Sequence, residues 1–180
     1  DLAEQSVNIV RYGADQKGLK VFLELDPSMP RYAFVDPVRL RQVLANLLSN
    51  AVKFTEKGEV ALEIRFFSKN SGRGKIAFSV RDTGIGISRE EQEKLFQAFS
   101  QGDSSTTRRF GGTGLGLVIS EKLVRKMGGS IELQSLPGKG STFSFSIEVF
   151  CENETEPSKE AEEEVFFDKN APVTILIAED

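Results

Sequence analysis

Asp82-Thr83-Gly84-Ile85-Gly86 follows an alternating apolar run, and it is the first of three clusters rich in small residues. The other two are Gly112-Thr113-Gly114-Leu115-Gly116-Leu117 and Gly138-Lys139-Gly140-Ser141-Thr142. Glycine allows a positive φ and lets a ligand approach the main chain with no Cβ in the way. Three spaced clusters therefore predict a site for a ligand the size of a nucleotide.

Upstream of these clusters lies the strongest predicted helix. Asp36 is expected at its N-cap and Pro37 at its first position. Asn46 and Asn50 are one turn apart and Lys53 follows, so the three side chains project from one side, at the edge of an apolar stripe. Asparagine is a mediocre helix former, so a function is indicated: an amide oxygen for Mg²⁺ and a lysine for phosphate. The alternative is two solvated polar residues.

The rest of the chain predicts strands and helices that each have one apolar face. Such elements fit an α+β fold, a two-layer sandwich in which helices cover one face of a mixed or antiparallel sheet. Helices are expected over 1–16, 88–96 and 115–127, and strands over 19–25, 60–66, 76–80, 131–133 and 143–149.

Together with the stretch Asn46–Thr55, the three clusters resemble the N, G1, F, G2 and G3 boxes of the sensor histidine kinase ATP-binding domain. This domain is a member of the gyrase, Hsp90, histidine kinase and MutL superfamily. The resemblance covers residues 1–150 and implies a Bergerat-type sandwich that binds ATP with Mg²⁺. It also implies transfer of the γ-phosphate to a protein histidine.

The resemblance assigns roles to single residues. Asp82 would accept a hydrogen bond from the exocyclic amine of adenine, which guanine lacks at that position; the alternative is a turn-forming Asp-Thr-Gly. Residues 100–113 match the ATP lid, where Arg108 and Arg109 would contact the γ-phosphate or merely be solvated. Phe96 and Phe99 match the F box. The expected nucleotide-binding residues are Asn46, Asn50 (also the metal ligand), Lys53, Asp82, Gly84, Gly86, Ile87, Phe99, Arg108, Arg109, Gly112, Thr113, Gly114, Leu115, Gly116, Leu117 and Thr142.

One position departs from part of the superfamily. Members that hydrolyse ATP carry a glutamate, the general base for water, where this chain has Asn46, and a neutral amide cannot accept a proton. The chain also has no histidine, so the phosphorylated residue must lie elsewhere. We expect Asn46, Asn50 and Lys53 to serve a histidine kinase. The alternatives are an ATP-hydrolysing clamp, a non-catalytic nucleotide-binding docking module and a serine-directed kinase of the anti-sigma type.

Composition limits the other function classes. The longest apolar runs are a few residues, far short of the roughly 20 that span a bilayer, so this segment is not expected to contact a membrane. The single Cys151 cannot form an internal disulfide, which is compatible with the reducing cytoplasm. We expect this segment to be cytoplasmic, either in a soluble protein or as the cytoplasmic part of a membrane-anchored sensor. Residues 1–150 carry 21 Lys and Arg against 17 Asp and Glu, too sparse a basic surface for nucleic acid.

The C-terminal part differs in composition. Residues 151–172 carry 8 acidic and 2 basic residues and are expected to be a linker. The apolar run over 173–178, followed by Glu179 and Asp180, resembles the start of a receiver domain. The expected partners are this receiver and, as the resemblance to histidine kinases implies, the protein's own histidine-bearing dimerisation helices, in a full-length homodimer.

Overall fold

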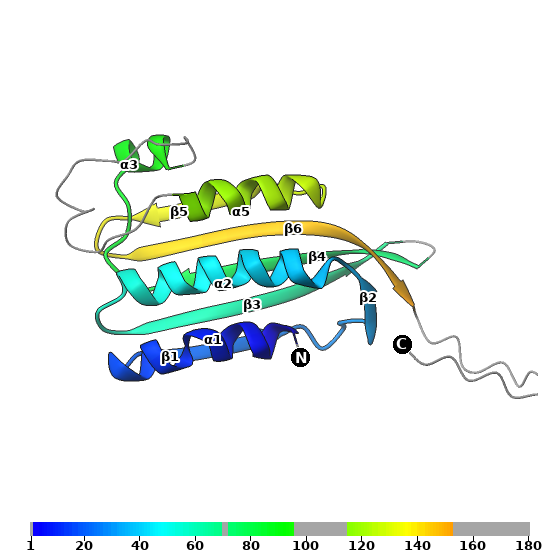
Figure 1. The fold of residues 1–180 in the computed structure, drawn as a ribbon, viewed down its shortest axis with the longest axis horizontal. Helices are drawn as coiled ribbons and strands as arrows, with labels where there is room; N and C mark the ends of the chain where they lie inside the picture. The colour runs from blue at the N-terminus through cyan, green and yellow to red at the C-terminus, as the bar shows by residue number, and fades with distance from the viewer. Residues whose placement is uncertain (1, 70–71, 96–114, 153–180) are drawn as a thin grey trace, which may run out of the picture.

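The computed structural model describes residues 2–69, 72–95 and 115–152 (Figure 1). Its helices are α1 (Leu2–Gln16), α2 (Pro37–Phe54), α3 (Arg89–Lys94) and α5 (Leu115–Lys126). Its strands are β1 (Lys20–Leu25), β2 (Tyr32–Phe34), β3 (Glu59–Ser68), β4 (Arg73–Asp82), β5 (Ile131–Leu136) and β6 (Gly140–Glu152). The expected α+β sandwich is confirmed, because α1, α2 and α5 lie in one layer over a mixed sheet.

The sheet of the described residues has six strands in the order β1-β3-β4-β6-β2, with β5 also paired to β6. β1 runs parallel to β3, and the other pairs are antiparallel. The short strand β2 was not predicted; it pairs with the last residues of β6, where Ala33 lies opposite Cys151. β6 thus extends two residues beyond the expected domain limit at 150, and Cys151 is buried.

The predicted start of α2 is confirmed. The Asp36 side chain accepts hydrogen bonds from the backbone N–H groups of Val38 and Arg39, each at 3.0 Å, and Pro37 occupies the first helical position. These bonds satisfy two of the N–H groups that the first turn of a helix leaves without partners. The N-cap therefore fixes where α2 begins, and this start determines the direction in which Asn46 projects from the helix.

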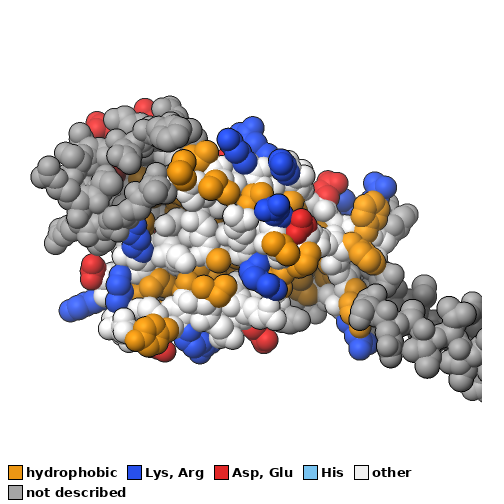
Figure 2. Space-filling model, viewed as in Figure 1, with side chains coloured by type: hydrophobic (Ala, Val, Ile, Leu, Met, Phe, Trp, Pro, Cys, Tyr) orange, Lys and Arg blue, Asp and Glu red, His pale blue; other side chains and the backbone are white. Residues whose placement is uncertain are grey.

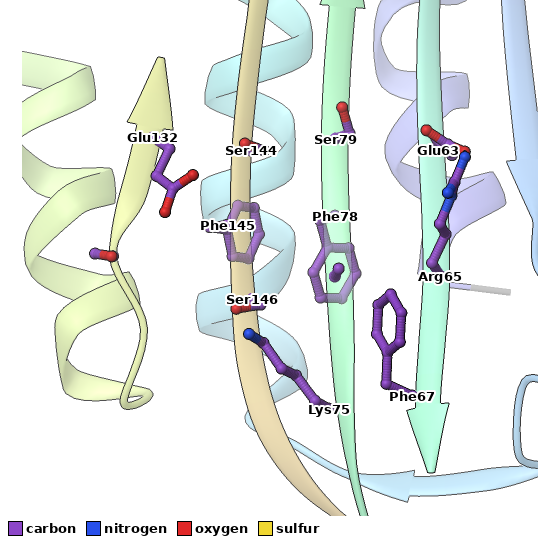
Figure 3. Close-up of a pocket in the computed structure, with 12 residues that line it drawn as sticks. Glu63, Arg65, Phe67, Lys75, Phe78, Ser79, Glu132, Ser144, Phe145 and Ser146 are labelled. Atoms are coloured by element: carbon purple, nitrogen blue, oxygen red, sulfur yellow. The ribbon is translucent and has the colours of Figure 1, made fainter. Parts of the chain in front are cut away.

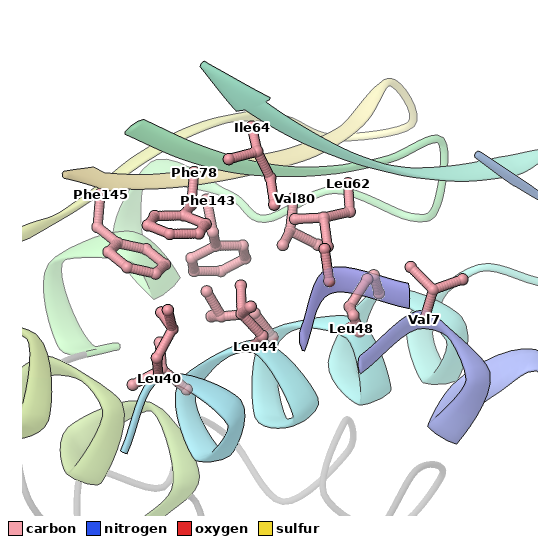
Figure 4. Close-up of a cluster of buried hydrophobic side chains, with 14 of the residues drawn as sticks. Val7, Leu40, Leu44, Leu48, Leu62, Ile64, Phe78, Val80, Phe143 and Phe145 are labelled. Atoms are coloured by element: carbon pink, nitrogen blue, oxygen red, sulfur yellow. The ribbon is translucent and has the colours of Figure 1, made fainter. Parts of the chain in front are cut away.

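The core lies between α1, α2 and the inner face of the sheet (Figure 4). The leucines of α2, among them Leu44 and Leu48, point at side chains of the central strands and are fully buried. Phe78 of β4 and Phe145 of β6 stack there with ring centroids 4.8 Å apart. Burying one such side chain stabilises the fold by roughly 1.5–3 kcal/mol, so this layer holds α2 rigidly on the sheet.

Two helix ends also follow sequence signals. The capping box of α3 is present, since Glu91 N–H donates to Ser88 Oγ at 3.3 Å and Ser88 N–H donates to the Glu91 carboxylate at 2.9 Å. α3 ends at Lys94 with Leu95 as its C-cap, and the expected extension to Phe96 lies outside the described residues. α5 ends one residue earlier than expected, and Gly128 follows with a φ of 82°.

Candidate functional site

Four segments that are far apart in the sequence meet at one end of the sandwich (Figure 1). They are the C-terminal end of α2, the end of β4 at Asp82, the turn between β5 and β6, and the start of α5. These segments carry the predicted N box, the first and third glycine clusters and the last residues of the second. The fold therefore brings the sequence-predicted motifs to one place.

Asp82 is the buried acid of this end. Only 7% of the residue is exposed, and its carboxylate accepts the backbone N–H of Gly84 at 2.8 Å and that of Ser141. Burial raises the pKa of Asp82, and the two N–H donors partly oppose that rise because they stabilise the ionised form. The site thus holds a carboxylate that accepts hydrogen bonds in a poorly hydrated environment.

Main-chain contacts lock the loop after Asp82 against its neighbours. Ile85 N–H donates to the carbonyl of Phe54 at the end of α2, at 3.2 Å, and Gly138 N–H donates to the carbonyl of Ile85 at 2.7 Å. Gly140 has a φ of 92°, and a Cβ there would lie 2.0 Å from the carbonyl oxygen of Asp82. Only glycine fits that approach, so the third cluster forms part of the wall beside Asp82.

Asn46 links α2 to α5. Its Nδ2 donates to Ser120 Oγ at 2.9 Å, and its Oδ1 would lie only 2.3 Å from a Cβ placed on Gly116. Gly116 therefore lets the start of α5 approach the amide. Asn50 and Lys53 lie farther along the same side of α2 and are half-buried, and the Lys53 ammonium is 4.9 Å from the centroid of the Phe54 ring.

The other predicted residues fall into two groups. Ile87 is half-buried in the loop after β4, and Leu115 and Leu117 belong to the first turn of α5, where Leu117 packs against the core. The predicted F-box residue Phe99, the lid and the first half of the second cluster lie outside the described residues, and with them Arg108, Arg109, Gly112, Thr113 and Gly114.

The structure does not bring Thr142 to this cluster. Thr142 pairs with Arg81 across β4 and β6, one step from the pair of Ser141 with Asp82. Neighbouring residues of a strand point to opposite faces, so the Thr142 side chain lies on the face away from the helices. Ser141, which is not among the predicted nucleotide-binding residues, lies beside Asp82 instead, and it is 6% exposed.

A shallow hollow of about 250 Å³ lies on the helix-free face of the sheet (Figure 3). Ser79, Ser144 and Ser146 line its floor, and charged side chains such as Glu132 and Lys75 border it. None of the predicted nucleotide-binding residues lines this hollow. The candidate site is therefore the edge at Asp82 and not this hollow.

Magnesium requires few protein ligands, because it retains waters and takes phosphate oxygens as its other ligands. Within the described parts of the chain, no three His, Cys, Asp or Glu side chains group as a metal site. The amide oxygen of Asn50 is of the donor type that magnesium prefers, and it lies one turn from Asn46 on α2. The residues present thus fit an ion that is shared with a phosphate group.

The outer side of the helix layer shows small hydrophobic groups among many lysines and arginines (Figure 2). Exposed apolar side chains of these helices include Ile9 and Tyr12 of α1, Val38 of α2 and Ile119 of α5. In the described part of the chain, no helix has the length and apolar content to cross a membrane.

Comparisons with known proteins agree with this geometry. Residues 35–150 match the protein family described as "Histidine kinase-, DNA gyrase B-, and HSP90-like ATPase". The signal transduction histidine-protein kinase BarA of Escherichia coli strain K12 is 43% identical over 146 residues, which are 81% of this chain. Hybrid signal transduction histidine kinase B of Dictyostelium discoideum is 41% identical over 154 residues, or 86% of this chain.

Among solved structures, the crystal structure of full-length ShkA in complex with AMPPNP is similar with a TM-score of 0.71 and 34% sequence identity. That similarity covers 84% of this chain and 30% of the ShkA chain. The matched region is 16% of BarA and 8% of the Dictyostelium kinase, so the chain spans a small part of these relatives.

Proposed function

Since the chain belongs to the family of histidine kinase-, DNA gyrase B- and HSP90-like ATPases, we propose that it transfers the γ-phosphate of ATP to a histidine outside this chain. It is an ATP-binding catalytic domain of the sensor histidine kinase type. The observation that carries the proposal is the buried Asp82 carboxylate at the end where the N box and two glycine clusters meet.

Adenine recognition rests on Asp82. An ionised carboxylate only accepts hydrogen bonds, and the exocyclic amine of adenine donates one, whereas guanine presents a carbonyl at that position. Because Asp82 is 7% exposed, a guanine carbonyl facing it would place two hydrogen-bond acceptors against each other, with little water to supply a donor. This arrangement weakens GTP binding. The site therefore favours ATP and ADP over GTP.

The phosphates lie toward the side of α2 that carries the polar residues. The amide oxygen of Asn50 is the ligand for magnesium, which offsets phosphate charge when it is bound. Lys53 adds a positive charge three residues farther along the helix. The start of α5, held against Asn46, directs backbone N–H groups and the positive end of the helix dipole toward phosphate.

The acceptor is an imidazole on another part of the full-length protein, because this chain contains no histidine. An imidazole nitrogen attacks the γ-phosphorus, the bond to the β–γ bridging oxygen breaks, ADP leaves, and the imidazole releases its proton. Asn46 does not serve as a base for water, since its side-chain amide is neutral and cannot accept a proton. A neutral amide at this position, instead of a glutamate, disfavours the ATP-hydrolysing clamp.

The wider assembly follows from the same proposal. The histidine is expected on the dimerisation helices of the same protein, which place the full-length protein in a homodimer. Residues 151–172 would connect the catalytic domain to a receiver that begins near residue 173, and all of these except 151 and 152 lie outside the described residues. We place the domain in the cytoplasm, where ATP is available.

Titration calorimetry of this chain with ATP, ADP and GTP, with and without Mg²⁺, tests the proposal. ATP and ADP should bind at least tenfold more tightly than GTP. Asn50→Ala should weaken binding in Mg²⁺ but leave the Mg²⁺-free affinity within about twofold of the parent, because only the metal ligand is lost. Equal affinities for ATP and GTP would reject the adenine assignment, and an unchanged Mg²⁺ dependence would reject the role of Asn50.

A further inference from the structure

A row of three polar side chains crosses the sheet beside the candidate site. Ser135 of β5 pairs with Ser141 of β6, and Ser141 pairs with Asp82 of β4. Paired residues on neighbouring strands point to the same face, so the three side chains line up next to one another on the helix-bearing face. Ser135 therefore lies on the strand next to Ser141, whose backbone N–H donates to the Asp82 carboxylate.

The hydroxyl of Ser135 makes three hydrogen bonds, and their donors can be assigned by counting protons. Its single proton goes to the carbonyl of Gly140 at 3.0 Å, because a carbonyl can only accept. Its oxygen accepts the backbone N–H of Ile87 at 2.8 Å. The 3.0 Å contact with Ser141 Oγ is then donated by Ser141. One hydroxyl thus joins the loop after β4 to the turn that begins β6.

Gln92 of α3 strengthens this junction. Its amide nitrogen has two protons, and it donates one to the carbonyl of Ile87 at 2.8 Å and the other to the carbonyl of Ser135 at 3.1 Å. Both backbone polar groups of Ile87 are therefore hydrogen-bonded, its N–H to Ser135 and its carbonyl to Gln92. α3 follows that loop directly, so the side chain also fixes α3 against the sheet.

We propose that Ser135 and Gln92 are positioning residues that set the ATP selectivity of this site by holding the Gly84–Ile87 loop and Ser141 around Asp82. No hydrogen bond joins either side chain to the Asp82 carboxylate in the described structure. Both side chains act indirectly, by holding the segments whose Gly84 and Ser141 N–H groups bond that carboxylate. The proposal rests on the proposed function, because it concerns the orientation of the group that recognises adenine.

The test compares ATP and GTP binding by Ser135→Ala and Gln92→Glu in the full 180-residue chain. Ser135→Ala leaves the Ile87 N–H and the Gly140 carbonyl without their partner, and Gln92→Glu replaces both donors by acceptors. Each change should weaken ATP binding about tenfold and lower the ATP to GTP affinity ratio by a similar factor. Ser135→Thr keeps the hydroxyl and should restore the ratio to within about threefold of the parent.

Ser146→Ala is the matched control, since Ser146 is a half-buried serine of β6 that faces the hollow on the opposite side of the sheet. It should leave the ratio unchanged. Unchanged selectivity in both Ser135→Ala and Gln92→Glu would overturn the proposal, and if Ser135→Ala does not fold, the result with Gln92→Glu decides.

Amide hydrogen exchange separates this proposal from the proposed function. In the nucleotide-free chain, Ser135→Ala and Gln92→Glu should each speed exchange at Ile87 and Ser141 at least tenfold, whereas Ser146→Ala should not. Equal ATP and GTP binding by the parent would reject the proposed function, whatever the exchange shows. A parent that prefers ATP, with exchange at both amides unaffected by the variants, would reject the positioning role alone.

Discussion

At the scale of single residues, the buried carboxylate of Asp82 costs stability, and its proposed role in adenine recognition would explain why it is kept. Burial disfavours the charged form of its carboxylate, and among the described residues the backbone N–H groups of Gly84 and Ser141 partly compensate. Asp82→Asn should therefore leave the thermal midpoint unchanged or raise it by a few degrees, while ATP binding falls at least tenfold and selectivity against GTP is lost. Calorimetric unfolding and nucleotide titration check the two effects. A variant with lowered stability and intact ATP selectivity would contradict this account.

The pH dependence follows from the direction of the same pKa shift. In the folded chain the pKa of Asp82 lies above the ordinary value of 3.8, so folding favours the protonated form. The ionised carboxylate therefore costs stability above the folded pKa, and this cost disappears as pH falls below the unfolded value. Protonation makes one carboxyl oxygen a donor and weakens the proposed acceptor for adenine, so ATP affinity should begin to fall at a higher pH than the titration of an ordinary aspartate would give.

Asp82→Asn supplies the control for this pH experiment, because it lacks the titrating group but shares the titration of the nucleotide itself. The affinity ratio of parent to variant should decline as pH is lowered from 7 toward 4. A ratio that stays constant across this range would show that Asp82 does not titrate in the binding reaction.

At the scale of elements, the end of α2 depends on a residue far away in the sequence. The Lys17 ammonium donates to the carbonyls of Val52, Lys53 and Thr55, at 2.8, 2.9 and 3.1 Å. These are carbonyls that the last turn of a helix leaves without partners, and a positive charge there also favours the helix dipole. Lys17 thus fixes the helix end whose Phe54 carbonyl anchors Ile85.

Lys17→Met keeps most of the side-chain length but removes the charge and the three donors. It should lower the free energy of unfolding by about 1–3 kcal/mol, as expected for hydrogen bonds that involve a charged group. Urea unfolding measures this change, and the exposed Lys57, converted to Met in the same way, is the control. Equal stabilities of the two variants would mean that Lys17 does not cap α2.

The sequence predicts elements whose signals are local. Asp36 with Pro37, and Ser88 with Glu91, begin helices through bonds to residues two or three positions away, so their patterns are visible in the chain. β2 is three residues long and is defined by its pairing with β6, which no local pattern reveals. The choice of Thr142 and not Ser141 as a nucleotide-binding residue has the same limit, because a shift of one position in a strand moves a side chain to the other face.

At the scale of the whole molecule, the candidate site exists because the fold brings segments that are distant in sequence to one end of the sandwich. The glycine clusters and the N box predict a nucleotide ligand, but Ser135, Gln92 and Lys17 have no motif, since each makes a hydrogen bond to a residue at least 35 positions away that only the fold brings close. The architecture itself could be predicted from apolar alternation and helical stripes. The contacts that set the geometry around Asp82 could not, because they join β4, β5, β6 and α3 across the sheet edge.

This domain is proposed to transfer phosphate to an acceptor that lies outside it. The direct measurement incubates the chain with γ-labelled ATP and Mg²⁺, alone and with the segment of the full-length protein that is proposed to carry the histidine on dimerisation helices. We expect no label on this chain in either case, acid-labile label on the helices when they are present, and no transfer with Asn50→Ala. Rapid release of labelled phosphate by the chain alone, with no label on the helices, would contradict this proposal.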